Sequence, residues 1–138
     1  AIGVGLGLDR IVLEMQRIEA KSYTAPTPRV FIAQLGELAK RKGLRMFVDL
    51  TKQGILMGES FGRGSLKSQM RVANRLGCDV CLILGQKEAL DGTVILKDMI
   101  SGTQEIVVAD KLVEGVRKLL KMNQALLDAG HKPRPIED

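Results

Sequence analysis

Short apolar runs alternate with segments of helical periodicity along most of this 138-residue chain, and this order is the strongest limit on its fold. The runs at 30–34, 55–58 and 80–84 are typical of buried strands. The segments 35–53 and 65–76 between them have the apolar spacing of amphipathic helices. Strands that alternate with helices lie parallel in a sheet. The sequence therefore predicts an α/β domain with a parallel core.

The second half of this domain is predicted to add antiparallel strands. Runs at 93–99 and 103–108 flank Ile100-Ser101-Gly102, which is typical of a hairpin. Asp110 is the expected N-cap of a last helix, whose apolar pattern continues to Gly130. We therefore predict a mixed five-stranded sheet with helices packed on it.

The chain divides into four parts on composition. Residues 1–20 predict a strand that leads into a helix, and residues 21–28, with two prolines and no apolar periodicity, predict a linker. The sheet domain is expected over 29–121, followed by a helix extension and tail at 122–138. We expect the first part to be poorly anchored, because its helix would expose apolar side chains. These are Leu8, Ile11 and Met15.

The composition restricts the possible partners. A formal charge of +5 is compatible with a polyanion such as RNA. Aromatic residues make up only 3% of the chain, so a base-stacking sheet of the common aromatic RNA modules is excluded. The sequence has no run of about 18 apolar residues and no signal-peptide pattern at its start, so we expect a soluble, cytoplasmic protein without membrane contact.

The two cysteines form a C-x-x-C pair, Cys78 and Cys81, which in other contexts binds zinc or carries redox chemistry. Here the pair enters the apolar run 80–84, where residues three apart point to opposite faces of a strand. The only histidine is His131 in the tail, so a second ligand pair is missing. We expect both thiols to be structural and no metal to bind.

The segment 58–69 is the first candidate site. It places Arg63 between glycines and Ser65 at the start of a helix, where free N–H groups favour anions. One side of that helix is predicted to carry the polar residues Lys67, Arg71, Asn74 and Arg75. These could follow an RNA backbone, or they could be an ordinary solvated helix face. Gln69 falls on the apolar side and needs a partner, for which a group inside the protein is favoured over a ligand.

Gln34 and Glu37 form the second candidate site, at the end of the first strand. Their amide and carboxylate could hydrogen-bond to base edges, whereas arginine and lysine would bind phosphates. The alternative for Glu37 is simple stabilisation of the first helical turn. No P-loop, dinucleotide loop or nucleophile turn occurs, so we predict no complete catalytic site in this chain.

Several of these motifs, taken in order, resemble a known family. G-L-G-L-D-R at 5–10 resembles motif 3 of class II aminoacyl-tRNA synthetases, with Arg10 at the position that contacts ATP and Asp9 where glutamate is more common. V-F-I-A-Q-L-G-E, G-R-G-S-L-K-S-Q-M, A-N-R-L-G, D-G-T-V-I-L-K-D-M and S-G-T-Q-E resemble the C-terminal anticodon-binding domain of histidyl-tRNA synthetases. This second resemblance covers residues 30–121.

The resemblance implies a fold, a partner and a parent activity. The fold would be that of an anticodon-binding domain, and the partner would be the anticodon stem-loop of histidine tRNA. The parent enzyme would be a cytoplasmic homodimeric histidine-tRNA ligase that uses ATP and Mg. Motifs 1 and 2 are missing, so the chain resembles a C-terminal fragment that is inactive alone. The alternative is a small-nucleotide-binding or regulatory interaction domain without ligase activity.

Overall fold

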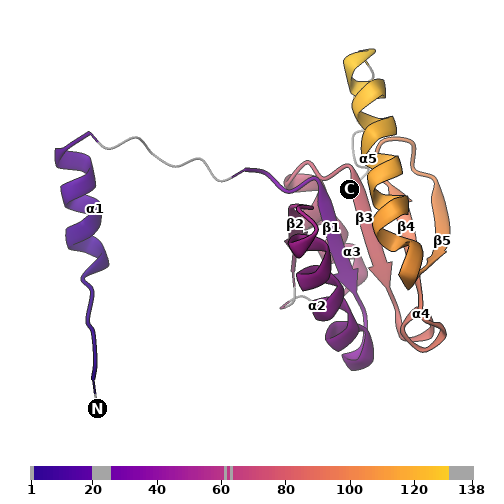
Figure 1. Cartoon of the computed structure of the whole chain (residues 1–138), viewed down its shortest axis with the longest axis horizontal. Helices are drawn as coiled ribbons and strands as arrows, with labels where there is room; N and C mark the ends of the chain where they lie inside the picture. The colour runs from indigo at the N-terminus through magenta and orange to yellow at the C-terminus, as the bar shows by residue number, and fades with distance from the viewer. Residues whose placement is uncertain (1, 20–25, 61, 63, 131–138) are drawn as a thin grey trace.

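Five strands form a single sheet in the order β2-β1-β3-β4-β5 (Figure 1). The computed structural model describes residues 2–19, 26–60, 62 and 64–130. β1 (Val30–Gln34), β2 (Met57–Glu59) and β3 (Val80–Leu84) are parallel. β4 (Thr93–Asp98) and β5 (Gln104–Val108) form an antiparallel hairpin beside β3. The predicted mixed five-stranded sheet is confirmed.

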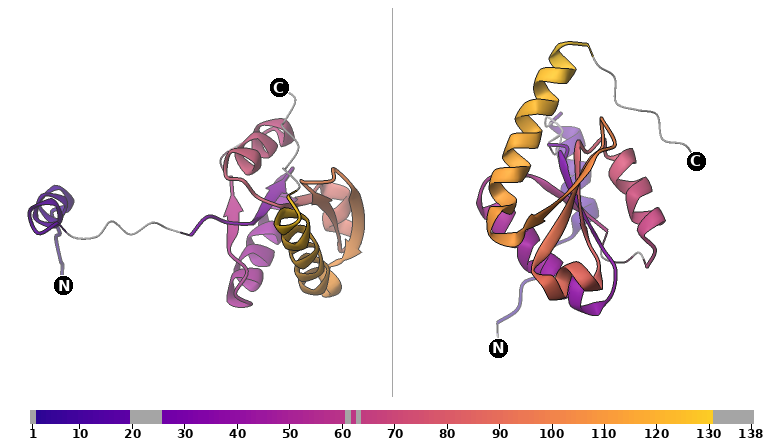
Figure 2. Two further views of the ribbon diagram at one scale, coloured as in Figure 1. Left: turned by 90° about the horizontal axis from the view of Figure 1, so that it is seen from above. Right: turned by 90° about the vertical axis from the view of Figure 1, so that its right-hand side faces the viewer.

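Helices cover the two faces of the sheet unequally. α2 (Glu37–Lys52) and α5 (Leu112–Asp128) pack on one face, and α3 (Leu66–Arg75) packs on the other (Figure 2). The larger apolar cluster lies under α2 and α5, while a smaller one lies under α3. Both faces of β1 and β3 are therefore covered, which explains why these strands are continuous apolar runs.

Gly43 allows α2 to approach the sheet closely. A Cβ atom at this position would lie 3.4 Å from Ile32 Cδ1, so even alanine would be in tight contact with β1. Ala39 and Leu50 are buried with Gly43 on the same face of α2, as the amphipathic pattern of this segment indicates.

The structure differs from the sequence-based expectation at several element ends. α2 begins two residues later than predicted, because Gly36 adopts φ +96°. The short helix α4 (Gln86–Asp91) was not predicted, since six residues are too few to display a helical period. Asp110 was expected to cap the last helix and this is wrong: it lies inside a 3-10 turn, η1 (Ala109–Lys111), and α5 begins after that turn with Lys111 as its N-cap.

The N-terminal helix α1 (Leu8–Arg17) contributes nothing to this core. In Figure 1 it lies apart from the sheet, and none of its residues is buried. The expected exposure of Leu8, Ile11 and Met15 is confirmed, at 74%, 43% and 44%. The prediction of a strand before this helix is wrong. Residues 2–7 contain no strand, and no described strand lies beside them to pair with. Among the described residues, no helix is long and apolar enough to cross a membrane.

The two cysteines are both buried, as expected, but not on opposite faces. Cys78 and Cys81 belong to the same cluster under α3, because Cys78 precedes β3 and does not follow its alternation. Burial raises the pKa of Cys78 to about 11 and that of Cys81 to about 12. Both are therefore neutral thiols at physiological pH.

A buried carboxylate fixes the hairpin turn to α5. Asp98 is 1% exposed, and its Oδ1 accepts hydrogen bonds from the Ile100 N–H at 2.9 Å and from Asn123 Nδ2 at 3.0 Å. Its Oδ2 accepts one from Ser101 Oγ. Burial acts to raise the pKa of Asp98, but the hydrogen bonds from Ser101, Ile100 and Asn123 outweigh it, and the pKa lies below its usual value.

We predict that this carboxylate makes the fold acid-sensitive. A carboxyl pKa that is lowered by folding stabilises the protein above the unfolded-state pKa of about 3.9, and this contribution is lost as the pH falls through the lowered value. Asp98→Asn should lower the free energy of unfolding at neutral pH by about 1 to 3 kcal/mol and flatten its decline in acid. Urea unfolding across acidic pH measures both, with the exposed Asp91→Asn as control. Parallel pH curves for the parent and Asp98→Asn would contradict this account.

Candidate nucleic-acid interface

The parallel strands end at one edge of the sheet, and α3 begins there. Ser65 is its N-cap, with its Oγ accepting a hydrogen bond from the Ser68 N–H at 3.2 Å, as expected. Ser68 Oγ in turn donates to the Ser65 carbonyl at 2.8 Å. The exposed N-terminus of a ten-residue helix therefore lies at the sheet edge. Arg63, expected beside it, falls outside the described residues.

Gln69 holds α3 to β1 through two buried hydrogen bonds. Its Oε1 accepts from the Gln34 N–H at 2.9 Å, and its Nε2 donates to the Gln34 carbonyl at 2.7 Å. β2 stops at Glu59, opposite Ile32, so the Gln34 backbone has no strand partner on that side. The Gln69 amide supplies both bonds instead. The favoured expectation of a partner inside the protein is confirmed.

The side chain of Gln34 does not lie where a base could reach it. Its amide was expected to reach base edges, but the residue is 1% exposed and its side chain packs beneath Gly43 of α2. A strand between two helix layers is covered on both faces, so even its last side chain is enclosed. The Oε1 and Nε2 atoms of Gln34 have no hydrogen-bond partner among the described residues. The buried amide of Gln34 is therefore not offered to a base edge.

Glu37 is exposed at the first turn of α2, as expected. Its carboxylate pairs with Lys40 Nζ at 3.0 Å, three residues further along the helix. The carboxylate is 82% exposed, so this pair contributes little to stability. Glu37 lies at the same sheet edge as the start of α3, because the parallel strands β1 and β2 both end there.

The outer side of α3 carries Lys67, Arg71 and Arg75, which we call the basic stripe. All three are exposed, while Gln69 and Ala73 on the inner side are buried, as the helical pattern predicts. Within the described residues, none of the three forms an ion pair or a side-chain hydrogen bond. The cations are therefore available to an anionic ligand.

A second exposed surface was not predicted from the sequence. α3 contacts β1 and β2 and leaves the same face of the hairpin uncovered (Figure 2). We call this surface the open face. It carries alternate residues of both strands, which cross-strand pairing aligns. They are Thr93, Ile95, Lys97, Gln104, Ile106 and Val108.

The open face lies beside α3. Met70 of α3 contacts Cys81 of β3, with 3.4 Å between the two sulfurs, and Cys81 is paired with Lys97 on β4. Adjacent strands lie about 5 Å apart, so the open face begins one strand beyond α3. Ile106, at the middle of β5, is 71% exposed.

The open face could have been found from sequence by counting helices. The alternation T-V-I-L-K-D over 93–98 marks one buried and one less buried side of β4. Only one predicted helix follows the hairpin, and one helix can cover only one face. The hairpin was predicted, but its uncovered face was not.

Together these surfaces offer groups for anion binding and polar recognition. Cations on α3 can bind phosphates, and the amide of Gln104 can bind base edges. Arg10, on the exposed helix α1, has no side-chain partner among the described residues. In the described part of the chain, no three His, Cys, Asp or Glu side chains lie together in a way that could hold a metal ion.

The sequence was compared with protein families and with individual known proteins, and the two comparisons agree. A family model described as an anticodon binding domain matches residues 30–119. A histidine–tRNA ligase of Dehalococcoides mccartyi is 35% identical over 118 residues, which are 86% of this chain and 28% of that protein. One from Nitratidesulfovibrio vulgaris is 40% identical over 109 residues, which are 79% of this chain and 25% of that protein. The chain thus spans about a quarter of the length of these relatives.

Solved structures with the same fold include apo histidyl-tRNA synthetase from S. aureus, with a TM-score of 0.60 and 25% identity, covering 78% of this chain and 27% of that one. Histidyl-tRNA synthetase from Nostoc sp. PCC 7120 gives a TM-score of 0.64 at 23% identity, covering 83% of this chain and 28% of that one. The expected fold is confirmed.

Two buried glutamines should respond oppositely to the same substitution. Gln69→Met removes the partners of the Gln34 N–H and carbonyl and should lower the free energy of unfolding by about 2 kcal/mol or more. Gln34→Met removes two unpaired buried groups at similar volume and should leave stability unchanged or raise it. Urea unfolding of both variants measures this. Equal destabilisation by the two would show that the Gln34 amide has a partner.

Proposed function

The chain belongs to the anticodon-binding domain family over residues 30–119, and from that membership we propose that its sheet domain binds the anticodon stem-loop of a transfer RNA. The observation that carries the proposal is the extent of the match, which runs from β1 into α5 and so includes every strand. Family membership does not favour the alternative of a small-nucleotide or regulatory interaction domain.

We further propose that the bound tRNA is that of histidine and that the domain serves a histidine–tRNA ligase. The names of the relatives support this. Such a parent enzyme would be a homodimer that uses ATP and Mg²⁺, and Arg10 would supply one contact to ATP. Adenylation requires the phosphates, the metal and the amino acid to be held together. The 138-residue chain is therefore proposed to bind RNA without activating histidine by itself.

The basic stripe is proposed to bind the RNA backbone. Lys67 and Arg71 are exposed one turn apart on α3 and have no protein partner among the described residues. The N-terminus of the same helix at Ser65 adds a partial positive charge, and Arg63 precedes it in sequence. Cations in a row suit the regular spacing of phosphates, which contribute affinity without sequence preference.

The open face is proposed to read the bases. Gln104 and Lys97 project side by side from paired strands, and Ile106 offers an apolar surface for an unstacked base. Glu37, exposed at the sheet edge, is retained from the sequence analysis as a base-edge acceptor. Gln34 is left out, because its amide is buried.

We expect Lys67→Ala and Arg71→Ala to weaken binding of a histidine-tRNA anticodon stem-loop. Each should reduce the slope of log K against log salt by roughly 0.7, the value for one lost single-strand phosphate contact. Discrimination against a scrambled anticodon should survive. Fluorescence anisotropy at several salt concentrations measures both, with Arg41→Ala on α2 as an exposed control. If both stripe variants bind like the parent at every salt concentration, the stripe is only a solvated helix face.

Replacement of Gln104 should instead reduce sequence preference. Gln104→Ala removes a base-edge donor and acceptor, so the preference for the histidine anticodon should fall by about 1 to 3 kcal/mol, with the salt slope unchanged. Glu105→Ala is the matched control, because this neighbour is exposed on the other side of β5. Glu37→Ala tests the sheet edge in the same assay. Unchanged discrimination in Gln104→Ala and Glu37→Ala together would exclude both residues as base readers.

A further inference from the structure

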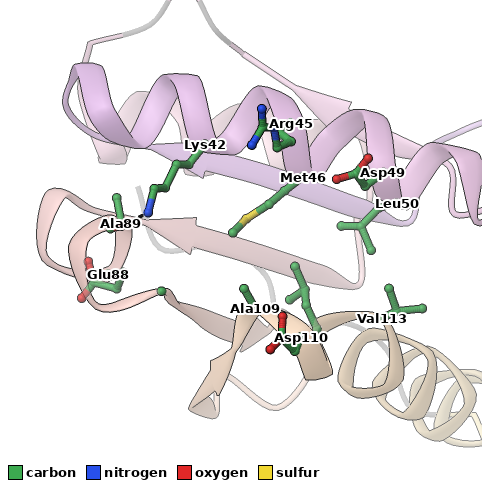
Figure 3. Close-up of a pocket in the computed structure, with 12 residues that line it drawn as sticks. Lys42, Arg45, Met46, Asp49, Leu50, Glu88, Ala89, Ala109, Asp110 and Val113 are labelled. Carbon is green, nitrogen blue, oxygen red and sulfur yellow. Dashed lines mark hydrogen bonds between the residues drawn. The ribbon is translucent and has the colours of Figure 1, made fainter.

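A groove lies on the sheet face opposite the basic stripe, between α2 and the junction of η1 with α5 (Figure 3). It encloses about 330 Å³, and α4 bounds one side. Pockets that hold small molecules in proteins have volumes of about 300 to 1,000 Å³. The groove is therefore large enough for a ligand of amino-acid size.

The floor of the groove is apolar. Leu50 of α2 and Leu112 of α5 are 2% and 3% exposed, and Met46 and Val113 pack against the same core. In Figure 3 the thioether of Met46 extends from α2 into the groove. A methionine adapts to the shape of an apolar group more readily than a branched side chain does. The floor thus suits a small apolar body.

Charged residues of both signs line the groove, with Lys42, Arg45 and Asp49 on α2 and Asp110 on the η1 side. Lys42 on α2 donates through Nζ to the Ala89 carbonyl at 2.6 Å, which leaves two of its three N–H donors. Arg45 lies one turn further along the same helix, and Asp110 lies on the η1 side. Within the described residues, Arg45 and Asp110 form no ion pair and no side-chain hydrogen bond. The groove therefore presents unpaired charges of both signs beside an apolar floor.

This charge pattern selects among ligand classes. A phosphate or other polyanion would meet the carboxylates of Asp49, Glu88 and Asp110, which also line the groove. A neutral apolar molecule would cover the charges without pairing them, which is costly. A zwitterion with an apolar body offers a partner to the cations, to the carboxylates and to the apolar floor.

We propose that the groove binds a free α-amino acid with an apolar side chain. The carboxylate is held by Lys42 and Arg45, the ammonium group by Asp110, and the side chain lies on Met46 and Leu50. The site is independent of the proposed RNA surface, since the sheet separates the groove from α3. It adds a small-molecule ligand to a domain proposed to bind RNA.

The test uses the whole chain with ¹³C-labelled methionine methyl groups and L-leucine as the probe. Met46 lines the groove, whereas Met70 and Met99 pack in the cluster on the opposite face and serve as internal controls. We expect L-leucine to shift the Met46 methyl signal saturably, with a Kd of about 1 mM or tighter. Met70 and Met99 should not move. No saturable shift at Met46 up to about 10 mM, or a shift confined to Met70 and Met99, would overturn the proposal.

Analogues of L-leucine test the contribution of each charged group and of the apolar side chain. N-acetyl-L-leucine lacks the ammonium group, L-leucinamide lacks the carboxylate, and glycine lacks the apolar body. The two derivatives should each bind at least about fivefold more weakly than L-leucine, the factor that corresponds to about 1 kcal/mol for a partly exposed ion pair. Glycine should also bind more weakly, because it buries no apolar side chain. Equal affinity for all four would mean that the groove does not recognise a zwitterion.

Substitutions in the protein test which charged side chains bind L-leucine. Arg45→Gln and Asp110→Asn should each weaken L-leucine binding about fivefold. The exposed Arg41→Gln and Asp91→Asn, outside the groove, are matched controls and should bind like the parent. Lys67→Ala should also retain L-leucine binding, which keeps this test separate from that of RNA binding. Parent-like affinity in Arg45→Gln and Asp110→Asn would overturn the assignment.

Discussion

The pair of hydrogen bonds between the Gln69 amide and the Gln34 backbone fixes how the two layers of this domain meet. β2 is only three residues long, so the end of β1 would be left without a partner on one side. A side-chain amide offers one donor and one acceptor at the spacing of a peptide group, and it can replace a missing strand residue. Because this amide belongs to α3, the helix is held in one rotational setting. That setting turns Lys67 and Arg71 toward solvent.

The sheet separates two surfaces of different character. α2 and α5 cover most of one face, and the groove between them carries charges of both signs. α3 covers only part of the other face and leaves the hairpin open beside a row of cations. An extended surface with a row of cations suits a polyanion, whereas a small mixed-charge groove suits a compact molecule. The different ligands proposed for the two faces follow from this unequal distribution of helices.

Much of the fold could be predicted from the sequence, because a buried strand and an amphipathic helix have different apolar periods. The limits of β1 and β3 and the capping by Ser65 were predicted correctly. The burial of Gln34 could not be predicted in this way. It depends on how closely the next helix, α2, approaches the strand at Gly43, and an apolar period does not give that distance. The open face was likewise not predicted, because it results from where a distant helix stops. Local pattern does not encode such long-range coverage.

Cys78 and Cys81 also have a practical consequence. Both thiols are almost fully buried, and the Sγ atom of Cys78 donates to the Pro28 carbonyl at 3.2 Å, just before β1. A thiolate is the species that reacts with alkylating reagents, and here it is suppressed twice, by lack of access and by the raised pKa values. Reaction with such a reagent therefore requires the cluster under α3 to open. The rate of this reaction therefore reports how often α3, the helix that carries the basic stripe, opens. No label has to be introduced into the protein for this measurement.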